Sequence, residues 1–296
     1  MKKLIIAIGF LAFACLSCKG DVEEQEPIAK PPKDTSGNLN VSVLIDLSDR
    51  IDPKKYPNPT MQYYLRDVGY INSVSEAFMA HVKGKKIKQM NDRIQMYFDP
   101  APLNPDINTI SKDLKFELTK ENVSNELLGK IEKSYKNEPL RLYQLAIKDN
   151  NYIGSDTWKF FQSRINDYCV EEAHRNILVI LTDGYIFYDH SLMKEANRTS
   201  YLTPKLIAEN KLNTPHWNSK LSSNNLGFIK ANEDLSNLEI LVLGINPNPK
   251  NPYEDKVIKA YWTKWFEEMK VKRYDIRTAE LPSDMDGIIK GFVGKK

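Results

Sequence analysis

The sequence has 296 residues, of which 41% are hydrophobic and 27% are charged. This is an ordinary globular composition. The length allows one large domain with insertions or two small ones, and we expect one. Because 42 basic and 39 acidic residues leave a net charge of only +3, no broad basic surface and no nucleic-acid partner are expected.

The N-terminus has the features of an export signal. Two lysines follow Met1, and the apolar run over 4–16 is too short to span a membrane. The small and apolar residues before Cys18 resemble the lipobox of bacterial lipoproteins, in which that cysteine becomes the acylated first residue. Ser17 at the cleavage point favours Cys18 over Cys15. The lipoprotein interpretation makes residues 1–17 the signal peptide, and the alternative is a plain signal peptide with two incidental cysteines.

Residues 18–38 are rich in Pro, Glu, Lys, Ser and Gly, so they cannot bury enough apolar surface to fold. We expect a flexible tether between a palmitate-type anchor and the domain. Lys19 stands where an inner-membrane retention signal would have Asp, which favours an outer-membrane lipoprotein of the cell envelope. The acidic residues 21–24 resemble surface-export signals, although such residues are also common in solvated tethers.

The remaining chain, residues 39–296, alternates strand and helix patterns. The apolar runs over 41–45, 176–181 and 238–245 contain very few polar residues. This pattern indicates strands that are buried on both faces, as in the centre of a parallel sheet. Further strands are predicted at 92–98, at 114–118 on an edge, and at 274–277. Helices are predicted at 64–82, 123–133, 140–148, 157–169, 257–266 and 282–292.

These elements predict an α/β fold, a doubly wound and mostly parallel central sheet with helices on both faces. In one segment, residues 185–236, the apolar residues follow neither the helix nor the strand period for long. It follows the carboxyl end of the second central strand. We therefore expect an insertion that overhangs whatever lies at that end.

Polar residues follow two of the central strands directly. Asp46 and Ser48 follow the first, and Asp183 follows the second. Ligands of doubly wound sheets bind beyond the carboxyl ends of the strands, so these three side chains are expected to face one crevice.

The whole region from residue 40 onward resembles a von Willebrand factor type A domain. The resemblance is carried by Asp46-Leu47-Ser48-Asp49-Arg50, by a hydroxyl-bearing segment before a central helix, and by Thr182-Asp183-Gly184. In that family the first motif is Asp-x-Ser-x-Ser, the middle segment supplies a Thr, and the late Asp completes a metal-ion-dependent adhesion site.

Carried over residue by residue, the resemblance implies that Asp46, Ser48 and Asp183 are metal ligands. Ser155 or Thr157 fills the role of the Thr. Mg²⁺ suits such hard oxygen ligands and keeps a position open for a partner's carboxylate.

Arg50 departs from the family pattern because it stands where the second Ser ligand belongs, with Asp49 beside it. Its guanidinium stays protonated and would repel a divalent cation. Two interpretations remain open. Either Arg50 points away from an intact Mg²⁺ site, or it replaces the metal and pairs with Asp46 and Asp183.

Two functions are consistent with these features. The first, implied by the resemblance, is a lipid-anchored binding module that presents the site to a protein or polysaccharide partner. The alternative is an Mg²⁺-dependent hydrolase that uses Asp46 and Asp183 to activate water. An enzyme is the less expected of the two, because Ser48 replaces the second Asp of haloacid dehalogenase phosphatases and the four histidines lack metal-ligand spacing.

Overall fold

Six strands form the central sheet of this computed structural model, which describes residues 37–294. The expected signal peptide, Cys18 and nearly all of the expected tether lie outside the described residues. The strands stand in the order β3-β2-β1-β4-β8-β9, and every neighbouring pair is parallel except β2 and β3. Their bounds are β1 Leu39–Ile45, β2 Asn91–Tyr97, β3 Phe116–Thr119, β4 Arg175–Leu181, β8 Leu238–Ile245 and β9 Arg273–Thr278.

This order is that of a doubly wound α/β sheet, so the expected fold class is confirmed. The chain moves outward from β1 to β2 and β3, and then returns to add β4, β8 and β9 on the other side of β1. The direction of winding therefore changes between β1 and β4. The crevice beyond this change is where such sheets bind ligands.

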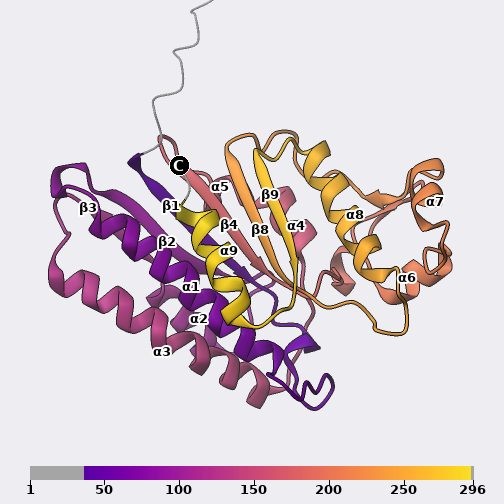
Figure 1. Cartoon of the computed structure of the whole chain (residues 1–296), viewed down its shortest axis with the longest axis horizontal. Coiled ribbons are helices and arrows are strands. Elements are labelled where there is room, and N and C mark those ends of the chain that lie inside the picture. The colour runs from indigo at the N-terminus through magenta and orange to yellow at the C-terminus, as the bar shows by residue number, and fades with distance from the viewer. Residues whose placement is uncertain (1–36, 295–296) are drawn as a thin grey trace, which may run out of the picture. The chain divides into compact units, whose positions relative to one another are not determined.

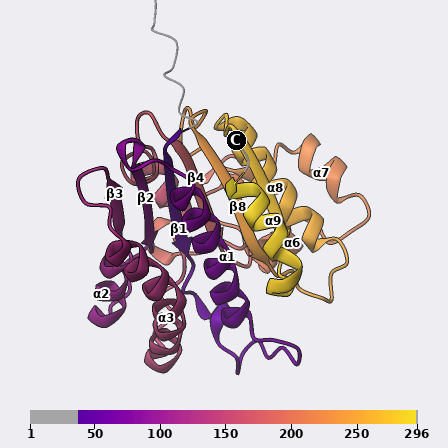
Figure 2. The same cartoon turned by 60° about the vertical axis from the view of Figure 1, so that its left-hand side comes forward.

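Helices cover both faces of the sheet (Figures 1 and 2). One face is covered by α1 (Tyr63–Lys83), α2 (Pro105–Asp113), α3 (Asn125–Asp149) and α9 (Pro282–Gly294), and the other by α4 (Thr157–Ser163), α5 (Ile165–Cys169) and α8 (Glu254–Glu268). Side chains of β1 alternate between the two cores: Val41 and Val43 pack with α1, and Leu44 packs with the opposite helices. All seven residues of β1 are buried, as a strand covered on both faces must be.

Two helix predictions need correction. The segments predicted at 123–133 and 140–148 are one continuous helix, α3, with Pro139 inside it. Pro139 is buried on the apolar face of α3, and packing of that face outweighs the hydrogen bond that proline cannot donate. The helix predicted at 157–169 is instead broken at Arg164 into α4 and α5. The short helix α2 was not predicted.

The insertion over 185–236 has structure of its own. It forms a small sheet of β5, β6 and β7 together with two short helices. The bounds are β5 Lys194–Glu195, β6 Arg198–Thr199, β7 Gly227–Phe228, α6 Pro204–Glu209 and α7 Trp217–Ser223. Phe228 packs edge-on against Tyr261 and Trp262 of α8, which joins the insertion to one core of the domain.

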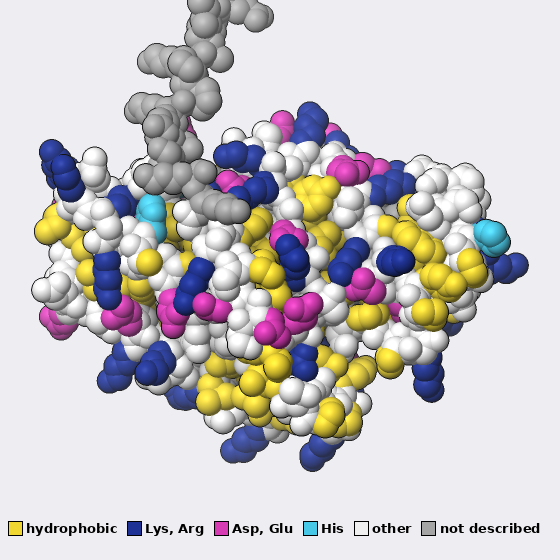
Figure 3. Space-filling model, viewed as in Figure 1, with side chains coloured by type: hydrophobic (Ala, Val, Ile, Leu, Met, Phe, Trp, Pro, Cys, Tyr) yellow, Lys and Arg dark blue, Asp and Glu magenta, His cyan; other side chains and the backbone are white. Residues whose placement is uncertain are grey.

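The surface carries charges of both signs. In Figure 3, Lys and Arg side chains are interspersed with Asp and Glu over the face that is viewed. Among the helices between residues 37 and 294, none is both long and apolar enough to cross a membrane.

Candidate functional site

A cleft of about 880 Å³ lies at the carboxyl ends of the central strands. Its floor includes Asp46 and Ser48 after β1 and Asp183 after β4, and the loop 246–249 after β8 forms one wall. The sequence-based expectation that these side chains share one crevice therefore agrees with the geometry. The insertion contributes Tyr185, Phe187, Asp189, Thr203 and Pro204 to the cleft, whereas most of its remaining apolar side chains pack near α8.

Asp46 is held in place by the strand that precedes it. Its backbone N–H donates to the Leu181 carbonyl at 3.0 Å, which extends the β1–β4 ladder by one residue. The two carboxylate oxygens accept from the Ser48 backbone N–H at 2.8 Å and from the Thr182 hydroxyl at 3.0 Å. With only 3% of its surface exposed, Asp46 is a fixed carboxylate whose oxygens are both hydrogen-bonded by the protein.

Arg50 points inward from the turn after β1. The 3-10 helix Asp49–Ile51 reverses the chain, and the guanidinium Nε donates to the Asp46 carbonyl at 3.0 Å. The Nη2 group donates to the Asp67 carboxylate at 2.6 Å and to the Leu181 carbonyl at 3.0 Å. The interpretation that Arg50 points away is therefore wrong. The alternative is correct for Asp46 but not for Asp183, because the second carboxylate that pairs with Arg50 is that of Asp67.

Asp67 and Tyr143 complete the network around Arg50. Asp67 lies on α1, and Tyr143, on α3, donates its hydroxyl to the Asp67 carboxylate at 2.9 Å. Burial alone would lower the pKa of Arg50, but the carboxylates of Asp67 and Asp46 outweigh burial and raise that pKa. The guanidinium is thus a permanent positive charge among these carboxylates.

Asp183 is the least compensated carboxylate of the floor. Its Oδ1 accepts from the Tyr185 backbone N–H at 3.1 Å, and its side chain is half-buried. Burial, together with the nearby Asp46, raises the pKa of Asp183 to about 7. Gly184 follows at φ +98°, where a Cβ would collide with Ile258. Only glycine can make this turn.

The two candidate hydroxyl ligands occupy different places. Ser155 lines the cleft and is bound through its backbone N–H to the Phe187 carbonyl at 3.1 Å. Thr157 begins α4 and is not among the residues that line the cleft. The two hydroxyls lie 3.1 Å apart and hydrogen-bond to each other. Of the two candidates, Ser155 is therefore the one that lines the cleft together with Asp46, Ser48 and Asp183.

These residues fit a divalent cation poorly. The guanidinium Nε of Arg50 lies 3.7 Å from Asp46 Oδ2. At roughly 5 Å and an effective dielectric constant near 20, it would repel a divalent cation by about 6–7 kcal/mol. Both oxygens of Asp46 already accept hydrogen bonds. Between residues 37 and 294 there is no group of three or more His, Cys, Asp or Glu side chains placed to hold a metal ion. Mg²⁺ binding stays a prediction.

Aromatic and proline side chains form the walls of the cleft. Tyr56 and Phe187 are each 43% exposed at its rim. Tyr185 is fixed by hydrogen-bonding Glu254 of α8 at 2.6 Å. Lys55 pairs with Asp49 at 3.1 Å, and these two partly exposed side chains both line the cleft.

Several residues of the site were missed by sequence reasoning. The loop 246–249 could have been found, because it follows a buried strand in the same way as Asp46 and Asp183. Asp67 and Tyr143 could not. They lie on helices that cover the sheet, and no motif marks them as partners of Arg50.

Comparisons with known proteins give only distant likenesses. No protein-family model matches the chain. No curated protein matches it either. Among solved structures, similar ones are the pilus adhesin SpaC from Lactobacillus rhamnosus GG (8% identity, 86% of this chain and 30% of that chain, TM-score 0.38) and a von Willebrand factor type A protein from Catenulispora acidiphila (11%, 87%, 42%, TM-score 0.39).

A mutant of the PilB minor pilin from Streptococcus sanguinis is also similar, at 12% identity over 90% of this chain and 63% of that chain, with a TM-score of 0.33. The chain thus spans less than two thirds of each of these three structures. All three TM-scores are low, and no family is assigned from them.

Proposed function

We propose that this chain is a binding module of the cell envelope. An acyl group on Cys18 would anchor it as an outer-membrane lipoprotein, and the cleft would bind a protein or polysaccharide partner. The observation that carries the binding role is the buried position of Arg50, whose charge offsets that of the floor carboxylates from within the protein.

The Arg50 network favours binding over hydrolysis. A hydrolase of the alternative kind needs Asp46 and Asp183 to hold Mg²⁺ next to a water molecule. Asp46 instead accepts hydrogen bonds from Ser48 and Thr182, and Arg50 places a fixed positive charge beside it. These contacts hold the floor of the cleft rigid and occupy the oxygens of Asp46. Such a floor suits the binding of a partner better than the binding of a metal ion.

The walls and mouth indicate the chemistry of the partner. Exposed aromatic side chains such as Tyr56 and Phe187 supply large contact areas at a small cost in conformational entropy. Asp49, Asp183 and Asp189 add carboxylates to the same cleft. A partner that presents hydroxyl or basic groups next to apolar surface suits this lining, whether a glycan or a protein segment.

The test is site-specific crosslinking in the cells that produce the full chain. A photoreactive phenylalanine analogue replaces Phe187 at the rim of the cleft, and in a matched control it replaces Tyr168, which is 41% exposed on α5. The proposal expects a defined adduct from position 187 and none from position 168. Equal capture from both positions would place recognition elsewhere.

The hydrolase alternative is tested separately with the purified full chain. Turnover of a generic phosphoester that requires Mg²⁺ and is lost in Asp46→Ala would support the alternative and contradict the proposed binding role. Retention of all crosslinking in the absence of turnover would leave the binding module as the function.

A further inference from the structure

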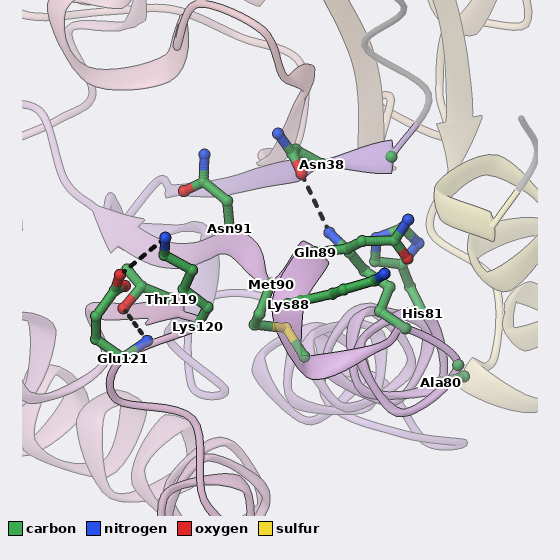
Figure 4. A pocket seen from close by; sticks show the side chains of 13 residues that line it. Asn38, Ala80, His81, Lys88, Gln89, Met90, Asn91, Thr119, Lys120 and Glu121 are labelled. Carbon is green, nitrogen blue, oxygen red and sulfur yellow. Dashed lines mark hydrogen bonds and ion pairs between the residues drawn. The ribbon is translucent and has the colours of Figure 1, made fainter.

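A second hollow, of about 940 Å³, lies at the opposite end of the sheet from the cleft. Figure 4 shows it between the start of β1, the end of α1 and the turn after β3, with Lys88 and Lys120 among its side chains. The seven residues of β1 separate the two ends, a distance of about 23 Å at the rise of a strand.

One side of this hollow is the loop that follows α1. The helix ends at Gly84, and the sequence Lys85-Lys86-Ile87-Lys88 leads into a 3-10 helix, Ile87–Gln89. Lys85 fixes the loop, because its ammonium lies 2.6 Å from the fully buried carboxylate of Asp92 and 3.2 Å from the Asn38 side-chain oxygen. The lysines that follow are therefore presented from a fixed turn.

Lys86, Ile87 and Lys88 form what we call the lysine–isoleucine surface. Both lysines are exposed, and neither makes an ion pair with another residue of the described chain. Ile87 is 65% exposed between them. An exposed apolar side chain flanked by free ammonium groups suits the boundary of a lipid bilayer, where the lysines bind headgroup phosphates and the apolar tip enters the acyl region.

The path of the chain places this surface near its attachment point. Gly37, the first described residue, lines the same hollow, so the chain enters the domain here. Gly37 stands 19 positions after Cys18 in the sequence. A chain of that length can span at most roughly 65 Å, so an acyl group on Cys18 would keep the surface within reach of the membrane.

We propose that the lysine–isoleucine surface binds the phosphate headgroups of an anionic lipid bilayer. Contact at this end of the sheet directs the cleft away from the membrane, toward a partner. A soluble phosphate would use the lysines but would gain nothing from Ile87, which is why the bilayer is the source that the surface fits. This inference rests on the lipid anchor of the proposed function, but it does not depend on what the cleft binds.

The test uses the full chain bound to vesicles through its own N-terminus. Hydrogen exchange of the backbone amides over 85–90 is compared on vesicles of phosphatidylcholine alone and on vesicles that also contain phosphatidylglycerol. Exchange is expected to be slower on the anionic vesicles. Lys86→Gln and Lys88→Gln should each reduce this protection roughly fivefold, and Ile87→Ser should reduce it as well.

A matched control removes two exposed lysines elsewhere, Lys205→Gln and Lys256→Gln, and should leave the protection unchanged. Equal exchange on the two kinds of vesicle would overturn the proposal without any variant. If the control pair reduced the protection equally, the effect would depend only on the net charge of the protein. That result would also overturn the proposal. Protection by inorganic phosphate alone, equal to that on vesicles, would identify a soluble-phosphate site instead.

Discussion

The guanidinium of Arg50 and the carboxylate of Asp67 lie 2.6 Å apart, with side chains that are only 4% and 2% exposed. This pair connects the turn after β1 to α1, directly beside Asp46. It places a permanent positive charge where the resembled family has a hydroxyl ligand. The first two predictions depend on this relationship.

Arg50→Ser restores the family motif and leaves Asp67 without its cation. We expect the unliganded variant to lose about 3–5 kcal/mol of unfolding free energy, because a buried carboxylate becomes unpaired. Mg²⁺ should then raise the melting temperature of the variant more than that of the wild type. Thermal unfolding of both proteins, with and without Mg²⁺, checks this.

Arg50→Lys is the control, since it keeps the positive charge and should remain insensitive to Mg²⁺. If Mg²⁺ stabilised the wild type as strongly as Arg50→Ser, then Arg50 would not compete with the metal, and the floor of the cleft would accept a cation as it stands.

Tyr143→Phe removes the hydroxyl that donates to Asp67. Because the acceptor is charged, we expect a loss of about 1.5–3 kcal/mol in unfolding free energy, and a clearly smaller loss in an Asp67→Asn background. Denaturant unfolding of the four proteins of the cycle measures this coupling. Tyr135→Phe is the matched control on the same helix, because its hydroxyl donates to the neutral Leu114 carbonyl and should not couple to Asp67.

Asp183 gives the cleft a pH dependence. Its pKa in the folded protein is raised to about 7 from an ordinary value near 3.8, so the folded state holds a proton that the unfolded chain has already released between these values. The contribution of Asp183 to the free energy of unfolding is therefore fully present below about pH 4. It is lost as the pH rises to about 7.

Asp183→Asn should therefore be more stable than the wild type at pH 8, by on the order of 2 kcal/mol once partial exposure is allowed for, and about equal to it at pH 4. Unfolding free energies across this range test the difference. A difference for Asp183→Asn that is the same at every pH would contradict the assignment.

Cys18→Ser tests the anchor. Metabolic labelling with a palmitate analogue should tag the wild type and not this variant, because only a cysteine at the cleavage point is acylated. Cys15→Ser is the control and should keep the label. Label that persists in Cys18→Ser would move the anchor to Cys15 or contradict the lipoprotein prediction.

The sheet was predictable because its central strands are covered on both faces. Burial on both faces leaves a run such as Leu238–Ile245 with almost no polar residues. In β3, buried and exposed residues alternate, and this pattern indicates an edge strand. Long-range packing was less visible. Two helices were predicted at 123–133 and 140–148, and only the packing of α3 against the core shows why one helix continues through Pro139.

The location of the site was predictable from the sequence, but the contacts between its side chains were not. Asp46 and Asp183 follow buried strands, so topology alone brings them to one cleft. The direction of Arg50 depends on Asp67, which lies 17 residues further along on a helix whose periodicity describes packing and not charge. A partner that no motif marks thus sets the direction of Arg50, while metal binding stays a prediction.

The position of β1 between the chain entry at Gly37 and the cleft has a mechanical consequence. A load applied between these two points runs along β1, which is hydrogen-bonded on one side to β2 and on the other to β4. Both ladders are then sheared along their whole length, and no bond at an end can open before the others. The strand that presents Asp46 is thereby also a strand that such a load must shear on both sides before it can leave the sheet.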